Sequence, residues 1–276
     1  MGASNFSYLE KEFPILFNIG QTAEFNLYQD PVICLFKLRQ FGEKLTELLF
    51  GIHQLEFPYD NSFHNRLKTL EFEGLLPIQV KDLLFAIKSK GNVAVHQNKG
   101  TQEEAQNILL STFKIGKWFY QSYSEQNHDI SNVRFSLPER EDTRHALSLL
   151  ETQYAELQQK FDALIEQRDT SGLSNEKEKE IKVRSHSAAK KIEMSEAETR
   201  ELIDEQLRLA GWEVDTNTIN YKSNKTLPQR GKNMAIAEWP CQSKWADYAL
   251  FIGTELYGIV EAKKYASDIS TDLRQS

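Results

Sequence analysis

The stretch from Lys244 to Lys264 constrains the fold of this chain more than any other part of it. Two short runs rich in β-branched and aromatic residues flank Gly253-Thr254, a pattern that predicts a β-hairpin. The first run carries one acid, Asp247, and the second run ends in Glu261-Ala262-Lys263. Because side chains alternate along a strand with a period of two, Glu261 and Lys263 point to the same face. We therefore predict a sheet with an acid on one strand and an acid and a base on its neighbour.

Two carboxylates and an ammonium group that converge are what a hydrolase needs to hold a hard divalent cation and to orient a water molecule. Mg²⁺ takes oxygen ligands and keeps several waters, so two carboxylates are enough. The alternative is an edge hairpin with scattered surface charges, since an Asp followed at a distance by Glu-x-Lys is a short and common pattern. The apolar pair Ile259-Val260 favours the site, because Glu261 then leaves a core strand.

The turn of the hairpin decides whether Asp247 and Glu261 share a face. A regular two-residue loop at Gly253-Thr254 sets Asp247 opposite Val260, and Glu261 then points to the other face. An odd-length loop or a β-bulge pairs Asp247 with Glu261 instead, and bulges are common beside active sites. We therefore predict an odd-length connection or a bulge between the two acids.

Composition indicates a soluble protein of a reducing compartment. The 276 residues are enough for one large or two modest domains. No apolar run is long enough to span a membrane, and the N-terminus lacks a signal-peptide pattern. Cys34 and Cys241 lie far apart without C-x-x-C spacing, so we predict no zinc site. We expect a cytoplasmic location and no contact with a membrane.

The N-terminal part, residues 1–125, has the periodicity of an all-α bundle. Residues 1–30 are mixed, and four helices follow from apolar residues spaced by threes and fours: one from Val32 to Gly51, one around Leu67, one after Pro77 and one over 102–123. The segment G-N-V-A-V-H, residues 91–96, separates the third helix from the fourth, with Gly91 as a candidate for a positive φ. We interpret His96 as a buried, hydrogen-bonded structural residue.

Residues 126–192 read as a helical linker. Apolar residues between Leu147 and Leu164 alternate at threes and fours, which fits either a coiled coil or an amphipathic helix packed on a neighbouring domain. Residues 176–191 begin by alternating acid and base, a pattern typical of an exposed helix or linker. A last helix then begins at Ser195, where Glu198 three residues later completes a capping-box pattern.

The third segment, residues 193–276, resembles a known nuclease fold. A helix (E-T-R-E-L-I-D-E-Q-L-R-L-A-G-W), a strand, A-D-Y-A-L and G-I-V-E-A-K-K follow in the order of the PD-(D/E)xK nuclease core, with Ala246 in place of the proline. The same strings are similar to the nuclease domain of type I restriction enzyme R (motor) subunits. The R-L-K-T-L, G-L-L-P and G-N-V-A-V-H strings resemble the helical domain of such subunits, which is distantly related to HEPN domains.

The resemblance implies an α+β multidomain chain with an α/β restriction-endonuclease-like core that is incomplete at its C-terminus. It implies Mg²⁺-dependent hydrolysis of double-stranded DNA, with Asp247, Glu261 and the carbonyl of Ala262 on the metal and Lys263 activating water. The helix of such cores often adds a glutamate, here Glu198 or Glu201. Glu238 ranks lower as a further acid.

The resemblance also implies partners, namely methyltransferase and specificity subunits. The chain lacks a G-x-x-x-x-G-K-[ST] loop, so ATP is expected only in motor domains outside it. We interpret it as an N-terminal fragment of a longer subunit. Net charge is −7, although basic residues outnumber acidic ones from Thr216 onward. This balance suits a nuclease module for which other domains supply most of the DNA binding. The alternatives are a non-catalytic docking module and, more remotely, a HEPN-like ribonuclease that uses His96.

Overall fold

The computed structural model describes residues 4–126, 128–139, 144–166, 174–241 and 244–261. The chain divides into two compact units, Met1–Ile192 and Glu193–Ser276, and each is described by itself. The first unit is helical and the second combines helices with a sheet, so the α+β class predicted from the sequence is confirmed. In the described part of the chain, no helix has the length and apolar character needed to cross a membrane.

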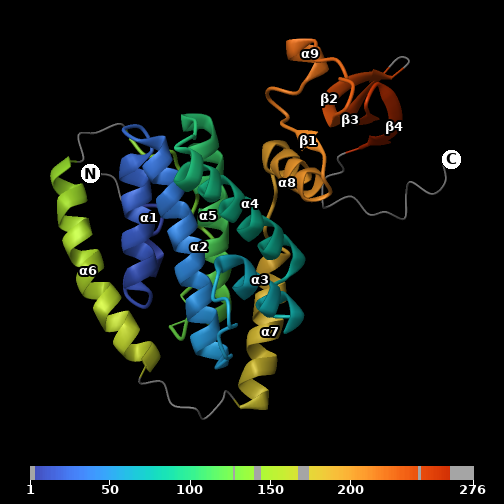
Figure 1. Ribbon diagram of the computed structural model, residues 1–276. Helices are drawn as coiled ribbons and strands as arrows, with labels where there is room; N and C mark the ends of the chain where they lie inside the picture. Colours follow the sequence, from blue (N-terminus) through green and yellow to red (C-terminus); the bar gives the residue numbers. More distant parts are fainter. Residues whose placement is uncertain (1–3, 127, 140–143, 167–173, 242–243, 262–276) are drawn as a thin grey trace. The chain divides into compact units, whose positions relative to one another are not determined.

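The helical unit contains the four helices predicted from periodicity, and two further helical elements precede them in the described residues. The short η1 (Ser7–Leu9) and α1 (Pro14–Asn26) precede α2 (Pro31–His53), α3 (Phe63–Phe72), α4 (Ile78–Gln97) and α5 (Gln102–Tyr123), as Figure 1 shows. Local signals start these helices: Asp30 caps α2 before Pro31, and Thr101 forms a capping box with Glu104 at α5. The core is rich in fully buried aromatic side chains, among them Phe6, Phe41, Phe119 and Trp118.

The segment around Gly91 continues a helix rather than ending one. Helix α4 runs through to Gln97, and Asn98, with φ at 51°, is its left-handed cap. Gly91 is buried, and a Cβ at this position would overlap the Cβ of Arg39 on α2. The glycine is therefore needed for the close approach of α2 and α4 and not for a turn. His96, in the last turn of α4, is exposed, so its interpretation as a buried structural residue is wrong.

The described residues of the segment 126–192 belong to the same compact unit as α1 to α5. Helix α6 (Arg144–Glu166) packs beside α1, where the Leu150 carbonyl accepts a hydrogen bond from Asn18 at 3.2 Å, and Tyr154 Oη accepts one from Gln40 at 2.8 Å. In Figure 1 this helix lies along the edge of the bundle next to α1. The packed amphipathic helix is thus the alternative that the contacts favour over a coiled coil.

Helix α7 (Asn175–Ala189) also packs on the bundle despite its charged sequence. The indole Nε1 of Trp118 donates to the carbonyl oxygen of Ser185 at 3.1 Å and to its hydroxyl at 3.2 Å. Ile181, Ser185 and Ala188 are buried on the side that faces α5. Of the two alternatives expected for this segment, an exposed helix or a linker, the structure has a helix, whose charged positions are mostly exposed and which buries one stripe against α5.

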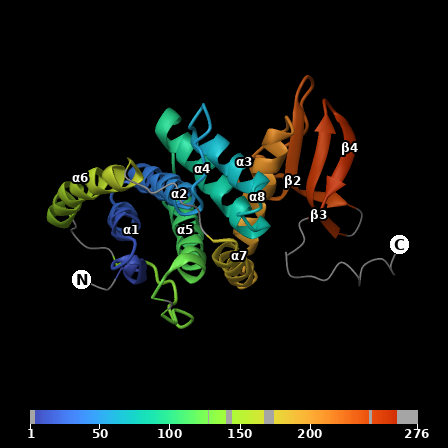
Figure 2. The ribbon, with the colours of Figure 1, turned by 90° about the horizontal axis from the view of Figure 1, so that it is seen from below.

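The second unit is a mixed sheet with α8 (Glu196–Leu209) on one face. The strands are β1 (Glu213–Val214), β2 (Asn233–Cys241), β3 (Lys244–Ile252) and β4 (Glu255–Val260), in that spatial order, and Figure 2 shows β2 to β4 side by side. β1 is parallel to β2, and the other neighbours are antiparallel. The α8 face buries Leu207 against Val214, Ala235, Ala237 and Tyr248. The short α9 (Tyr221–Asn224) covers part of the opposite face.

The predicted bulge is present in the hairpin. Phe251 pairs with Leu256, whereas Leu250 pairs with Gly258, so Tyr257 is an extra residue on β4. The turn itself is a two-residue loop at Gly253-Thr254, and Gly253 supplies a φ of 61°. Without the bulge this loop would set Asp247 opposite Val260. The prediction of an odd-length connection or a bulge between Asp247 and Glu261 is confirmed.

Candidate functional site

The bulge sets the register of the β3–β4 ladder, which ends one residue before the two predicted acids. Tyr248 pairs with Val260, and one further step along the same register sets Asp247 opposite Glu261. Directly opposite residues share a face of the sheet. Asp247 is partly buried and Glu261, just past the end of β4, is exposed. Ala262 and Lys263, the other predicted members of the site, lie outside the described residues.

The glutamates of α8 are held in different ways. Glu198 is buried and forms the predicted capping box, because its carboxylate accepts hydrogen bonds from the backbone N–H and the hydroxyl of Ser195, both at 2.8 Å. The capping role thus uses one of its oxygens, Oε2. Glu201, the other helix candidate, is half-buried one turn further along.

A residue that sequence reasoning did not single out, Arg200 of α8, joins Asp247 to Glu238. Its Nη2 lies 2.6 Å from Glu238 Oε1 and 3.3 Å from Asp247 Oδ1. The same nitrogen is 3.2 Å from the exposed Glu196, one turn before it on the helix. Burial on its own lowers the pKa of Arg200, but the hydrogen bond and charge of Glu238, with Tyr248 and Asp247, raise it overall. The guanidinium is therefore a fixed positive charge at the predicted metal-binding acid.

Glu238 reaches Arg200 from a distorted position in β2. It falls opposite Asp247, because Ala237 pairs with Tyr248 and Trp239 pairs with Ala246. Its φ is 50°, in the left-handed region that side chains of this size rarely adopt. The distortion breaks the alternation of the strand, since Trp239 packs with Met234 and Ile236 and not with Ala237. Backbone strain of this kind tends to cluster at functional sites.

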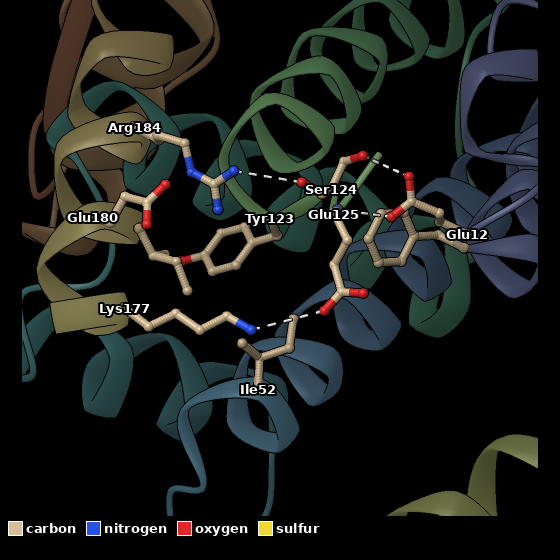
Figure 3. A pocket seen from close by; sticks show the side chains of 10 residues that line it. Glu12, Ile52, Tyr123, Ser124, Glu125, Lys177, Glu180 and Arg184 are labelled. Atoms are coloured by element: carbon tan, nitrogen blue, oxygen red, sulfur yellow. Dashed lines mark hydrogen bonds and ion pairs between the residues drawn. The ribbon is translucent and has the colours of Figure 1, made fainter. Parts of the chain in front are cut away.

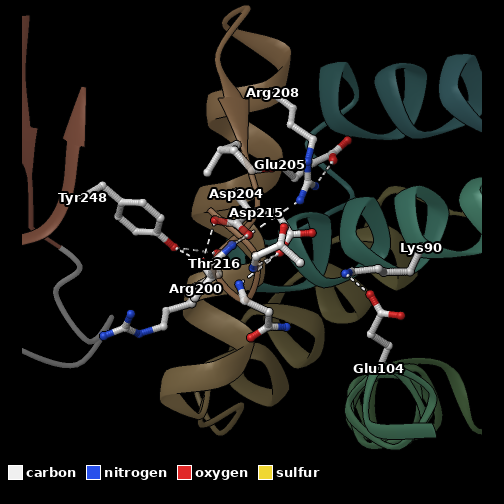
Figure 4. A network of polar contacts seen from close by, with 12 residues as sticks. Lys90, Glu104, Arg200, Asp204, Glu205, Arg208, Asp215, Thr216 and Tyr248 are labelled. Atoms are coloured by element: carbon white, nitrogen blue, oxygen red, sulfur yellow. Dashed lines mark hydrogen bonds and ion pairs between the residues drawn. The ribbon is translucent and has the colours of Figure 1, made fainter. Parts of the chain in front are cut away.

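A polar network fixes the α8 segment that carries Arg200, as Figure 4 shows. The Tyr248 hydroxyl lies 2.7 Å from Thr216 Oγ1 and donates to the Arg200 carbonyl at 3.3 Å. Asp204 accepts from the Thr216 N–H and hydroxyl, both at 2.8 Å. Burial and the nearby Asp204 charge raise the pKa of Tyr248, so its hydroxyl stays protonated. The network ties α8, the loop after β1 and β3 together directly beside Asp247.

The donor set around Asp247 fits a hard cation in its chemistry. Asp247 and Glu261 offer carboxylate oxygens on neighbouring strands, and the Arg200 guanidinium is already a cation held at Asp247. Within the ranges that the structure describes, no group of three or more His, Cys, Asp or Glu side chains is placed to hold a metal ion. Mg²⁺ needs only one or two carboxylates and keeps its waters, so the pair fits Mg²⁺ better than an ion that requires a full protein cage.

Basic and aromatic side chains lie next to the acids. Lys222 of α9 has its ammonium 3.9 Å from Glu238 Oε2 and 5.4 Å from the centre of the exposed Trp245 ring. The loop that holds α9 also contains Lys225, exposed and stacked near Tyr221. The polar segment 216–231 therefore places a base, Lys222, beside Glu238 and Trp245.

A second candidate is a pocket in the helical unit, shown in Figure 3. It has a volume of about 740 Å³, and Phe13, Ile52 and Tyr123 supply apolar walls. Glu12 spans one side and accepts hydrogen bonds from the Ser124 hydroxyl at 2.5 Å and the Glu125 N–H at 2.9 Å. The lining mixes acids with Lys177 and Arg184, so no single ligand charge is favoured. We therefore take the hairpin site as the candidate functional site.

Comparison with known proteins reveals similarity over both units. Residues 213–276 match the family model described as the second domain of the type I restriction enzyme EcoKI endonuclease subunit. Residues 21–132 match a domain of unknown function, DUF4145. No solved structure matches the chain.

One curated relative aligns with the whole chain. The type I restriction enzyme EcoKI endonuclease subunit of Escherichia coli (strain K12) is 29% identical over 330 aligned positions, which cover 100% of this chain. The chain spans 28% of the length of that relative. The family model matched by residues 213–276 covers β1 to β4, and therefore Asp247 and Glu261. The chain is thus similar, from its first helices to its hairpin, to part of a type I restriction enzyme endonuclease subunit.

Proposed function

We propose that this chain is the endonuclease portion of a type I restriction enzyme R subunit and takes part in Mg²⁺-dependent hydrolysis of double-stranded DNA. The observation that supports the proposal is the bulged register, because its continuation by one residue would set Asp247 opposite Glu261, in a segment similar to a restriction endonuclease subunit. The membership of the chain in the PD-(D/E)xK nucleases is part of the proposal.

Each residue has a role in the proposed reaction. Asp247, Glu261 and the carbonyl of Ala262 would hold Mg²⁺, and Glu198 or Glu201 would add a carboxylate from α8. The bound ion would supply positive charge for the phosphate and a water molecule of lowered pKa. Lys263 would orient that water and oppose the charge that develops on the phosphate. Lys222, whose ammonium is 3.9 Å from Glu238, and the neighbouring Trp245 would contact the DNA backbone.

The partners follow from the same proposal. Type I restriction enzymes separate cleavage from sequence reading, so the target would be chosen by a specificity subunit and methyltransferase subunits. ATP would act only in motor domains outside this chain. A HEPN-related origin of the helical unit is also part of the proposal, and the exposed position of His96 allows a surface role for it.

The experiment replaces the proposed catalytic residues in the complete R subunit, assembled with its partners. Glu261→Gln and Lys263→Ala are expected to abolish DNA cleavage and to leave ATP-driven translocation unchanged, because chemistry and motor lie on different domains. Glu255→Gln is the matched control, since Glu255 is an exposed acid at the other end of the same strand. Wild-type cleavage by either the Glu261 or the Lys263 variant would refute the site.

A further inference from the structure

Arg200 holds Asp247 in a way that a divalent cation must disturb. Its Nη2 is shared between Glu238 at 2.6 Å and Asp247 at 3.3 Å, so the contact with Glu238 is the shorter one. The Arg200 and Asp247 side chains are 15% and 24% exposed, so water only partly screens their attraction. A cation that binds Asp247 competes with the guanidinium for the same carboxylate.

Glu238 offers Arg200 a second carboxylate to bind. It lies opposite Asp247 in the β2–β3 ladder and contacts the same nitrogen of Arg200. The backbone of Glu238 is strained, with φ at 50°, and this conformation places its carboxylate beside Arg200. Other charged groups around Arg200 are Glu196 on its own helix and Lys222, whose ammonium is 3.9 Å from the other Glu238 oxygen. The Tyr248 hydroxyl binds the Arg200 carbonyl and keeps the backbone of α8 in place.

We infer that Arg200 is an exchangeable counter-cation of the proposed metal site. Without a divalent cation it bridges Asp247 and Glu238, and when a cation binds Asp247 it withdraws to Glu238 and Glu196. Arg200 is then a positioning residue that keeps Asp247 in place and sets the cation concentration at which the site fills. Glu238 acts through Arg200 and not as a metal ligand. This inference rests on the proposed function, because it needs Asp247 to bind a divalent cation.

The test is calorimetric titration of the 276-residue chain with Mn²⁺ alone, which reports binding without any cleavage. Arg200→Gln is expected to tighten Mn²⁺ binding by about threefold to fivefold, the factor that an ion pair of this exposure supplies. Arg208→Gln is the matched control: Arg208 is on the same helix and pairs with Asp204 and Glu205, so its loss changes net charge equally without removing the ion pair of Asp247 with Arg200. The control is expected to bind Mn²⁺ as the wild type does.

A double-mutant cycle separates the exchange from a simple sum of charges. Glu238→Gln alone is expected to weaken Mn²⁺ binding, because Arg200 then has only Glu196 besides Asp247. In the Arg200→Gln background the same change is expected to have no effect, because Glu238 no longer has an arginine to hold. Equal effects of Glu238→Gln in both backgrounds would overturn the inference that Arg200 exchanges with the cation. They would show that the Glu238 carboxylate attracts the cation directly.

The Asp247→Asn variant distinguishes failure of this inference from failure of the proposed function. If Asp247→Asn abolishes Mn²⁺ binding while Arg200→Gln leaves it unchanged or weaker, the counter-cation role is wrong and the metal site stands. If Asp247→Asn binds Mn²⁺ as the wild type does, the proposed metal site is wrong, and the exchange of Arg200 with a cation is wrong as well. Circular dichroism of each variant shows that the fold is kept.

Discussion

Protonation of His53, at the end of α2, lowers the stability of the helical unit. Its Nε2 lies 3.2 Å from the Tyr123 hydroxyl, and burial lowers its pKa from 6.5 to about 4. The folded chain therefore keeps the imidazole neutral, whereas the unfolded chain protonates it below pH 6.5. Stability that is fully present above pH 6.5 is lost as the pH falls toward 4.

We expect His53→Gln to reduce this loss. The free energy of unfolding, measured by urea titration at a series of pH values, should fall less steeply between pH 6.5 and 4 for the variant than for the wild type. Other groups that titrate in this range are common to both proteins, so the difference between the two curves isolates His53. Parallel curves would show that His53 titrates normally in the folded chain.

Gly91 gives a second prediction at the scale of one residue. In the middle of a helix, Gly→Ala normally stabilises by about 1 kcal/mol. Here the added Cβ meets the Cβ of Arg39, part of the α2 side chain closest to its backbone, so the two helices must separate. We expect Gly91→Ala to destabilise the chain, by about 1–3 kcal/mol as overpacking does.

Asn92→Ala is the control for this change, because it raises helix propensity at the next position of α4 without the overlap at Arg39. Thermal unfolding followed by circular dichroism measures both variants. A Gly91→Ala chain that is more stable than the wild type would mean that α2 and α4 do not approach as closely as described.

At the scale of the element, deletions in the hairpin test whether its register makes the site. Tyr257 is the bulged residue, and its side chain is mostly exposed. Deleting Tyr257 leaves Gly258 to follow Leu256 in the ladder, so Asp247 stays opposite Glu261 in a regular hairpin. Deleting both Tyr257 and Gly258 shifts the rest of β4 by one residue and sets Glu261 opposite Tyr248.

We therefore expect the single deletion to keep Mn²⁺ binding and the double deletion to lose it, as measured by calorimetric titration. The shift also moves Val260 away from the Tyr248 cluster, so the double deletion should be the less stable of the two. Loss of binding in both variants would mean that the bulge itself, and not the register that it sets, makes the site.

The elements that could be predicted from the sequence are those set by local chemistry. The capping boxes at Thr101 and Ser195 mark the starts of α5 and α8, and simple counting along the hairpin requires a bulge if its two acids are to face each other. Helix α7 could not be placed in this way. Its acid–base alternation is typical of a solvated helix, and only the tertiary contact between Trp118 and Ser185 shows which face is buried.

The candidate site was predictable in its acids and not in its arginine. Arg200 lies four residues after Glu196, a spacing that indicates only a surface ion pair along one helix. Its contacts with Glu238 and Asp247 depend on how α8 lies on the sheet, and the positive φ of Glu238 leaves no signal in the sequence. Long-range packing decides both features, and residue spacing carries no information about it.

At the scale of the whole molecule, the chain consists of two units that meet at residues 192 and 193. Residues 1–192 include α6 and α7, whose contacts with Asn18 and Trp118 complete the helical core. We expect a protein of residues 1–192 to unfold cooperatively and a protein of residues 1–125 to be far less stable, because it exposes the α7-facing side of α5. Differential scanning calorimetry of the two proteins tests this division. Cooperative transitions at equal temperatures in both proteins would contradict it.

The central claim is that Asp247 and Glu261 together hold a divalent cation. Anomalous diffraction from crystals of the chain grown with Mn²⁺ tests it most directly. We predict one Mn²⁺ peak within direct ligand distance of a carboxylate oxygen of Asp247 and of Glu261, with the Arg200 guanidinium on Glu238. Saturating Mn²⁺ that gives no peak between these two acids, with Arg200 still on Asp247, would contradict the claim.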